Sequence, residues 1–273
     1  MPQTVSKRLS GILLAAAFAL GAAPPVHGRD LPVDLELVLA VDVSGSVDEV
    51  EAKLQRDGYV QAMRHPDVVK AIASGVLQRI AVTYVEWAGE ETQTTVLGWT
   101  LIDSEGAAYA FSKALDATPI SRGRYTSISQ AIRYSLPLFD GNGFEGTRRV
   151  IDVSGDGANN TGGLVNFARD EAVAKGVVIN GLPIVNGRPN RFGHQLPDLD
   201  LYYRNCVIGG PGAFIVVAQD FESFARAVRK KLVLEIAAAP PPAGPRRLLQ
   251  RAAVEGPPCD AGERRLRRMF MDP

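Results

Sequence analysis

The chain has 273 residues, enough for one full domain with terminal extensions. Its 30 Lys and Arg residues balance its 30 Asp and Glu residues, so no overall field favours a nucleic acid or an anionic membrane as partner. Its 2 cysteines and 3 scattered histidines show no spacing typical of a zinc site.

The N-terminus is typical of an export signal. Lys7 and Arg8 precede an apolar run over 11–20, which is too short to span a bilayer comfortably, and small residues follow. Cleavage is expected after Ala23 or Gly28, and a retained membrane anchor is the alternative. We therefore expect a signal peptide over 1–28, no stable membrane span after its removal, and a periplasmic or secreted mature protein.

The strands and helices alternate along the rest of the chain. Apolar and β-branched runs predict strands at 35–41, 79–87, 94–102, 148–154, 177–184 and 214–218, the third as an antiparallel edge strand. Helical spacing predicts helices at 47–74, 104–115, 127–139, 164–175 and from Phe221 to Leu232. His65-Pro66 is expected to break or kink the first helix.

This alternation predicts an α/β fold with a mostly parallel sheet covered on both faces. The domain is expected to span 33–237, with a longer irregular region at 185–205. On the last helix, Arg226, Arg229, Lys230 and Lys231 are expected to be mostly solvated. Residues 238–273 are interpreted as a Pro-rich linker followed by a basic, partly disordered tail.

The two cysteines leave two alternatives open. An oxidising compartment permits a disulfide between Cys206 and Cys259. Cys259, however, lies in the Pro-rich tail, and Cys206 is more simply interpreted as a small buried hydrophobic residue near the start of a strand.

Three oxygen-bearing side chains follow the first strand at alternate positions. Asp42, Ser44 and Ser46 can converge from one tight loop, and oxygen ligands suit a hard divalent cation. Alone, however, this pattern is more often a turn or a helix N-cap.

Two later positions complete a possible set. Thr126 directly precedes the helix at 127–139, and Asp156 follows the strand at 148–154. Because ligands in open parallel sheets bind at the carboxyl ends of the strands, Asp42 and Asp156 are both expected there. Asp152 competes as the second acid, although it falls inside its strand.

Asp42-Val43-Ser44-Gly45-Ser46, Thr126 and Asp156-Gly157 occur in the order of the metal-ion-dependent adhesion site (MIDAS) of a von Willebrand factor A (vWA) domain. The sequence resembles this family over 33–237, which implies a Rossmann-like sheet with one antiparallel edge strand. The family usually has Thr-Asp-Gly where this chain has Gly155-Asp156-Gly157. The stretches at 42–47, 155–157 and 206–214 also resemble an uncharacterised group of exported bacterial vWA-like proteins.

The resemblance implies a metal site and a mode of binding. Ser44, Ser46 and Thr126 would bind Mg²⁺ (or Mn²⁺) directly, and Asp42 and Asp156 would act partly through water, with Ca²⁺ left open. The cation would then accept a carboxylate from a partner protein, so the expected function is non-enzymatic protein binding.

Residues beside the site are open to two interpretations. Arg122, Arg124 and Tyr125 form either a rim around the cation or a solvated loop. Asn159, Asn160 and Thr161 follow Asp156 and are further candidates for the border of the site.

Two alternative functions remain. Asp42 at a strand end also resembles aspartyl-phosphate nucleophiles, as in a metal-assisted phosphatase or hydrolase, but Ser44 stands where these often carry a second acid. Ser44-Gly45-Ser46 also lacks the Gly-x-Ser-x-Gly turn of the α/β-hydrolases. The other alternative is a structural vWA domain without a functional metal.

Overall fold

The computed structural model describes residues 29–186, 195–238 and 255–271, and it confirms the predicted α/β fold. A five-stranded sheet has the order β4-β3-β2-β6-β7. Its members are β2 (Leu35–Asp42), β3 (Ile80–Trp87), β4 (Gln93–Ile102), β6 (Arg149–Gly155) and β7 (Val178–Pro183). All pair in parallel except β4, which is the antiparallel edge strand that the sequence predicted.

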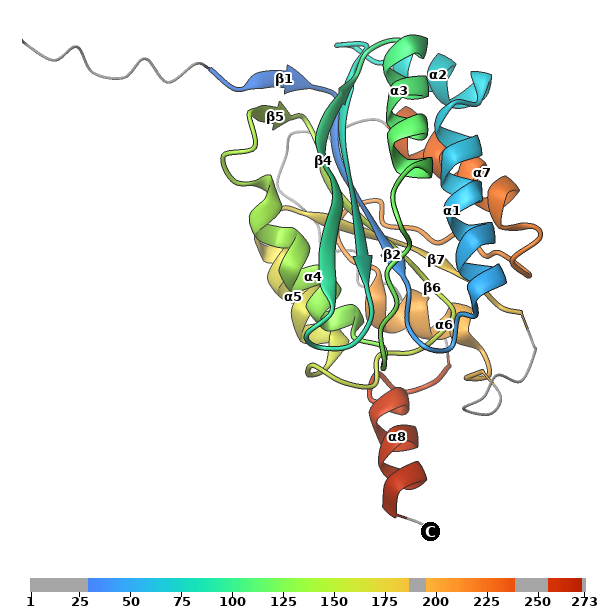
Figure 1. The fold of residues 1–273 in the computed structure, drawn as a ribbon. Coiled ribbons are helices and arrows are strands. Elements are labelled where there is room, and N and C mark those ends of the chain that lie inside the picture. Colours follow the sequence, from blue (N-terminus) through green and yellow to red (C-terminus); the bar gives the residue numbers. More distant parts are fainter. Residues whose placement is uncertain (1–28, 187–194, 239–254, 272–273) are drawn as a thin grey trace, which may run out of the picture.

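Helices cover both faces of this sheet (Figure 1). One face carries α1 (Glu49–Met63), α2 (Pro66–Ala73), α3 (Glu105–Asp116) and α7 (Phe224–Ala237). The other carries α4 (Ile128–Ser135), the 3₁₀ turn Leu136–Phe139 and α5 (Val165–Ala174). The short α6 (Leu199–Tyr202) continues into a π-helical turn, Tyr203–Val207, and α8 (Ala261–Met271) follows near the C-terminus. A separate small parallel pair joins β1 (Leu31–Val33) to β5 (Phe144–Gly146).

The central strand β2 contributes side chains to two separate hydrophobic cores, one on each face of the sheet. Leu35, Leu37 and Leu39 belong to the core under α1 and α7, whereas Val38 and Ala40 belong to the core under α4 and α5. Because side chains alternate along a strand, the continuous apolar run is what a strand buried on both faces requires.

The predicted break at His65-Pro66 is confirmed. The helix expected over 47–74 is two helices, because Pro66 begins α2 and His65 caps it by accepting a hydrogen bond from the Asp67 N–H at 3.2 Å. Proline is favoured at the first helical position, where its missing N–H costs nothing.

A continuous strand at 214–218 was a wrong prediction. The segment makes only two isolated bridges to β7, at Ile215 and Ala218. Backbone hydrogen bonds form on either side of the interruption between these two bridges: Val216 N donates to Gly181 O at 3.0 Å, and Ala218 N donates to Pro183 O at 3.0 Å. Pro183 has no N–H to donate between them, so the ladder is interrupted.

The expectation that Lys231 is solvated was also wrong. Its side chain is fully buried between α7 and the sheet, where its Nζ lies 2.6 Å from Asp152 Oδ1 and 3.1 Å from Glu235 Oε2. Asn180 donates to Glu235 at 2.5 Å. A buried cation of this kind is tolerated because charged partners surround it.

The C-terminal region, for which a partly disordered tail was expected, contains an ordered segment. Its described part, 255–271, contains α8 and a disulfide between Cys206 and Cys259, so Cys206 is not simply a buried hydrophobic residue. The proposed signal peptide over 1–28 and much of the Pro-rich linker lie outside the described residues. Among the residues that are described, no helix is both long and apolar enough to cross a membrane.

The buried Lys231 gives a test of the fold. Lys231→Ala is expected to lower the free energy of unfolding by about 3–5 kcal/mol, because it leaves Asp152 and Glu235 buried without their cation. The matched control Lys230→Ala removes an exposed lysine and should change little. Urea unfolding followed by circular dichroism measures both, and equal stabilities of the two variants would contradict this account.

Candidate metal centre

The two acids of the predicted set lie where the order of the strands reverses. After β2, the chain adds β3 and β4 on one side of β2 and then β6 and β7 on its other side, so β2 and β6 are neighbours in the sheet. Asp42 is the last residue of β2, and Asp156 directly follows β6. In α/β sheets, ligands bind outside the carboxyl ends of the strands at such a reversal.

Hydrogen bonds connect four of the five predicted positions. Asp42 Oδ1 accepts from the Ser44 N–H at 2.7 Å, which closes the tight loop after β2. The Ser44 and Ser46 hydroxyls are 3.0 Å apart, and Ser46 donates to Asp156 Oδ1 at 2.6 Å. The structure therefore gathers side chains that are more than a hundred residues apart in sequence, as the separation of 110 between Ser46 and Asp156 shows.

Thr126 reaches the same place from a third loop. Its N–H donates to Asn160 Oδ1 at 2.9 Å, and its carbonyl accepts from the Asn160 N–H at 2.8 Å. Its hydroxyl would lie 3.5 Å from a Cβ at Gly157, next to Asp156. Tyr125 before it has a positive φ of 63°, an uncommon conformation for a residue with a side chain, which turns the loop at this point.

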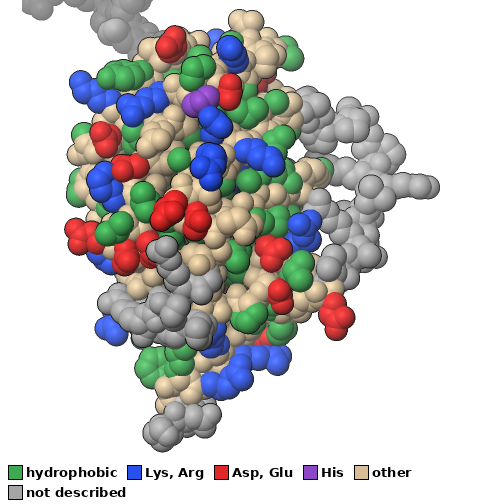
Figure 2. Space-filling view, turned by 90° about the vertical axis from the view of Figure 1, so that its right-hand side faces the viewer, with side chains coloured by type: hydrophobic (Ala, Val, Ile, Leu, Met, Phe, Trp, Pro, Cys, Tyr) green, Lys and Arg blue, Asp and Glu red, His purple; other side chains and the backbone are tan. Residues whose placement is uncertain are grey.

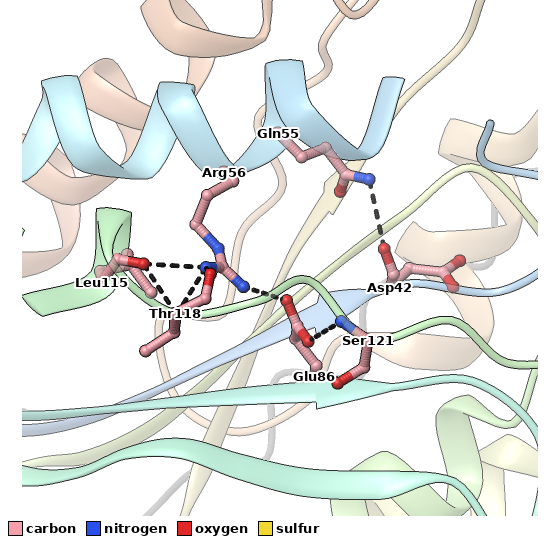
Figure 3. Close-up of polar contacts among 7 residues, drawn as sticks. All are labelled: Asp42, Gln55, Arg56, Glu86, Leu115, Thr118 and Ser121. Atoms are coloured by element: carbon pink, nitrogen blue, oxygen red, sulfur yellow. Dashed lines mark hydrogen bonds and ion pairs between the residues drawn. The ribbon is translucent and has the colours of Figure 1, made fainter. Parts of the chain in front are cut away.

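Buried polar contacts fix the loop that leads to Thr126 (Figure 3). Arg56 of α1 is ion-paired with Glu86 of β3, and it donates to the carbonyls of Leu115 at 2.8 Å and Thr118 at 2.9 Å. Glu86 in turn accepts from the Ser121 N–H at 2.8 Å. Gln55, the neighbour of Arg56, donates to the Asp42 carbonyl at 3.2 Å, so one turn of α1 holds two of the site's loops.

Both acids are protonated more easily than usual. Burial raises the pKa of Asp42 well above its ordinary value, and the nearby charge of Asp156 raises it further. Burial likewise raises the pKa of Asp156, to about 6, against the opposing effect of the hydrogen bond from Ser46. Two carboxylates that share a buried place repel each other when both are ionised, and a cation between them would remove that cost.

One carboxylate oxygen has no partner. Asp42 Oδ2 is buried and receives no hydrogen bond from any described residue. A buried carboxyl oxygen without a partner is costly, and a bound ion or water at this point would satisfy it. With two carboxylates and three hydroxyls, the set consists entirely of the oxygen donors that Mg²⁺ and Mn²⁺ prefer.

The departure from Thr-Asp-Gly has a steric reason. A Cβ at Gly155 would lie 2.8 Å from Asp42 Oδ2 and 2.9 Å from the Tyr203 hydroxyl, so no side chain fits there. Tyr203, from the π-helical turn, is fully buried and supplies bulk beside Asp42. No local sequence pattern indicates this role of Tyr203, because it depends on a contact between distant segments.

Asp152, the competing second acid, lies elsewhere. It points from the middle of β6 towards Lys231, away from the strand end. The part of the chain that the structure describes holds no group of three or more His, Cys, Asp or Glu side chains arranged for a metal. The hydroxyl-rich set is therefore the candidate that remains.

A cavity of about 180 Å³ opens onto Ser46, Thr126 and Asp156. Arg124 and Tyr125, two of the three rim candidates, line it, and so does Asn160, one of the border candidates. Residues of α8, which the sequence analysis did not anticipate, line it as well. Arg122 instead donates to the Val47 carbonyl at 3.2 Å, and Asn159 supports α4 through its bond from the Ser129 N–H at 2.9 Å. The Thr161 carbonyl accepts from Ser127 at 2.9 Å.

The raised pKa values predict how pH affects the metal-free protein. Since the pKa of Asp156 is higher in the folded state, about 6 against 3.8, the fold binds a proton that the unfolded chain releases. Stability should therefore fall as pH rises through this window. With a chelator present to remove metal, the Asp156→Asn variant should be more stable than the parent protein at about pH 8. This difference in stability should shrink as the pH falls towards about pH 4. Thermal unfolding across this range measures it, and a pH-independent difference would refute the assignment.

Comparisons with solved structures support the fold. Proximal thread matrix protein 1 from the mussel byssus is 14% identical with a TM-score of 0.55, and the match covers 77% of this chain and 49% of that one. A second structure of that protein, with a zinc-occupied MIDAS motif, has a sequence identity of 13%, a TM-score of 0.52 and the same coverage of both chains. A von Willebrand factor type A protein from Catenulispora acidiphila has a sequence identity of 12% and a TM-score of 0.52, and the match covers 75% of this chain and 43% of that one.

At these identities the likeness shows the vWA fold alone, and the chain spans about half the length of the mussel protein. No curated protein matches the sequence. A family model described as "Protein of unknown function (DUF1194)" matches residues 32–240, which is most of the chain. The chain therefore belongs to the DUF1194 family, and its fold is that of a vWA domain.

Proposed function

We propose that this domain binds a divalent cation, Mg²⁺ or Mn²⁺, and uses it to recognise an acidic group on a partner protein outside the cytoplasm. Ser44, Ser46 and Thr126 are the direct ligands, and Asp42 and Asp156 balance the charge and orient bound waters. The observation that carries the proposal is the buried, unpartnered Asp42 Oδ2 beside Asp156.

The donor set favours recognition over hydrolysis. Three of the five proposed positions are neutral hydroxyls, so a bound cation keeps much of its charge for a further anionic ligand. Ser46, Thr126 and Asp156 line an open cavity, so a carboxylate from another molecule has a path to that position. The zinc in the MIDAS motif of the mussel protein supports a divalent cation in this fold. The pilus adhesin SpaC from Lactobacillus rhamnosus GG shares the fold at 13% identity and a TM-score of 0.53, which is consistent with a binding role.

Calorimetric titration tests the metal site. The metal-stripped protein should bind Mg²⁺ or Mn²⁺ saturably, and Asp42→Ala and Thr126→Ala should each lower the affinity by at least about tenfold, the range seen for lost supporting groups at metal sites. Asp48→Asn is the matched control, because Asp48 is an exposed acid in the same loop that caps α1 and asparagine caps equally well. Unchanged affinity in Asp42→Ala would show that the assignment is wrong.

A screen for turnover separates binding from catalysis. With Mg²⁺ present, we expect no hydrolysis of aryl phosphates or aryl esters above the level of the Asp42→Asn variant. Robust turnover that Asp42→Asn abolishes would favour the metal-assisted phosphatase or hydrolase instead. If neither metal nor acidic ligand binds, the structural vWA domain becomes the better interpretation.

A further inference from the structure

Helix α8 turns one face towards the candidate metal centre. Residues 262, 265, 266, 269 and 270 line the cavity that reaches Ser46, Thr126 and Asp156. This spacing of three and four residues places them on a single side of the helix. In Figure 1, α8 projects from the end of the molecule where the parallel strands end, which is also the end that carries the site.

Three contacts fix α8 in this position. The Cys206–Cys259 disulfide ties the segment before the helix to the π-helical turn. Asn159 donates to Glu263 Oε1 at 2.7 Å, so α8 is bonded to the same loop that follows Asp156. Gly262 packs directly on that loop, since a Cβ there would lie 2.0 Å from the Asn159 carbonyl oxygen. The first turn of α8 is therefore anchored to the site.

The side of the cavity formed by α8 is apolar and incompletely covered. Leu266 is half-buried, whereas Met269 is 47% exposed and Phe270 is 73% exposed. Across the cavity, Tyr125 is 43% exposed. Large apolar side chains that gather around a polar site without packing into a core are typical of an interaction surface.

The same surface is basic. Arg124 and Arg265 line the cavity, and α8 carries Arg264, Arg267 and Arg268 on its other sides. Apolar and basic side chains lie next to each other at the lower end of the molecule in Figure 2, at the height of α8 in Figure 1. A positively charged surface around the site favours an acidic partner and repels a basic one.

We infer that α8 determines the ligand specificity of the metal centre. It selects a protein segment in which an apolar side chain lies next to the carboxylate that binds the metal. This inference rests on the proposed function and names its partner chemistry. The carboxylate reaches towards Ser46, Thr126 and Asp156, while the neighbouring apolar group packs on Met269 and Phe270. A cavity of about 180 Å³ is small against the roughly 300–1,000 Å³ of pockets for drug-sized ligands, so it suits side chains of a docked segment.

Binding of short peptides tests the inference. Fluorescein-labelled Gly-Leu-Asp-Leu-Gly and Gly-Ser-Asp-Ser-Gly are titrated against the full chain in Mn²⁺, with Gly-Leu-Asn-Leu-Gly and added chelator as blanks. Leucine on both sides of the aspartate covers both chain directions. The leucine peptide should bind about tenfold more tightly than the serine peptide, as expected for partial burial of one apolar side chain.

Exposed residues provide matched variants that do not threaten the fold. Met269→Ser with Phe270→Ser should reduce the preference for leucine to near unity while Mn²⁺ affinity, measured separately by calorimetry, stays at the parent value. Phe167→Ser on α5 removes a comparably exposed aromatic, 57% exposed, that does not line the cavity, and it should retain the preference.

The outcomes separate the two proposals. Equal binding of both aspartate peptides, with Mn²⁺ binding intact, overturns the role of α8 and leaves the proposed function standing. Tighter peptide binding when Met269 and Phe270 are replaced also overturns it, because α8 would then be a cover over the site. If Mn²⁺ binds but no aspartate peptide binds, or if Mn²⁺ itself fails to bind, the proposed function falls first and the inference falls with it.

Discussion

Two buried carboxylates at the ends of neighbouring strands are the constraint on which this structure depends. Asp42 and Asp156 are almost completely buried, and burial raises the pKa of each. The fold stabilises them only in part, through the Ser44 N–H and the Ser46 hydroxyl, and Asp42 Oδ2 has no partner in the described chain. A buried anion pair that is left so incompletely satisfied is understandable if a cation belongs between the loops.

The surrounding structure holds these groups in place at several independent points. The Arg56–Glu86 pair fixes the loop before Thr126, reciprocal bonds join Thr126 to Asn160, and Gln55 holds the end of β2. Gly155 leaves the space that Asp42 and Tyr203 occupy. A metal site needs such support, because ligands that are ordered beforehand lose less entropy on binding.

Much of the fold could be predicted from the sequence, because its signals are local. The apolar run of β2, the proline at the start of α2 and the alternation of elements each follow from neighbouring residues, and so does the placement of Asp42 and Asp156 at strand ends. The misses depend on contacts between distant segments. Lys231 lies on the polar-looking side of its helix but meets Asp152 of β6, and the ladder fails at 214–218 because of Pro183 on another strand. The sequence permits the pairing of Cys206 with Cys259 without deciding it, and no local pattern indicates the approach of α8. The metal-binding roles of the five residues stay a prediction.

A crystal structure of the protein grown with Mn²⁺, with anomalous data collected at the manganese absorption edge, tests the central claim most directly. The account predicts one anomalous peak among the hydroxyls of Ser44, Ser46 and Thr126, with Asp42 and Asp156 within reach directly or through water. An ordered site with no peak there, or with the manganese bound elsewhere, would contradict it.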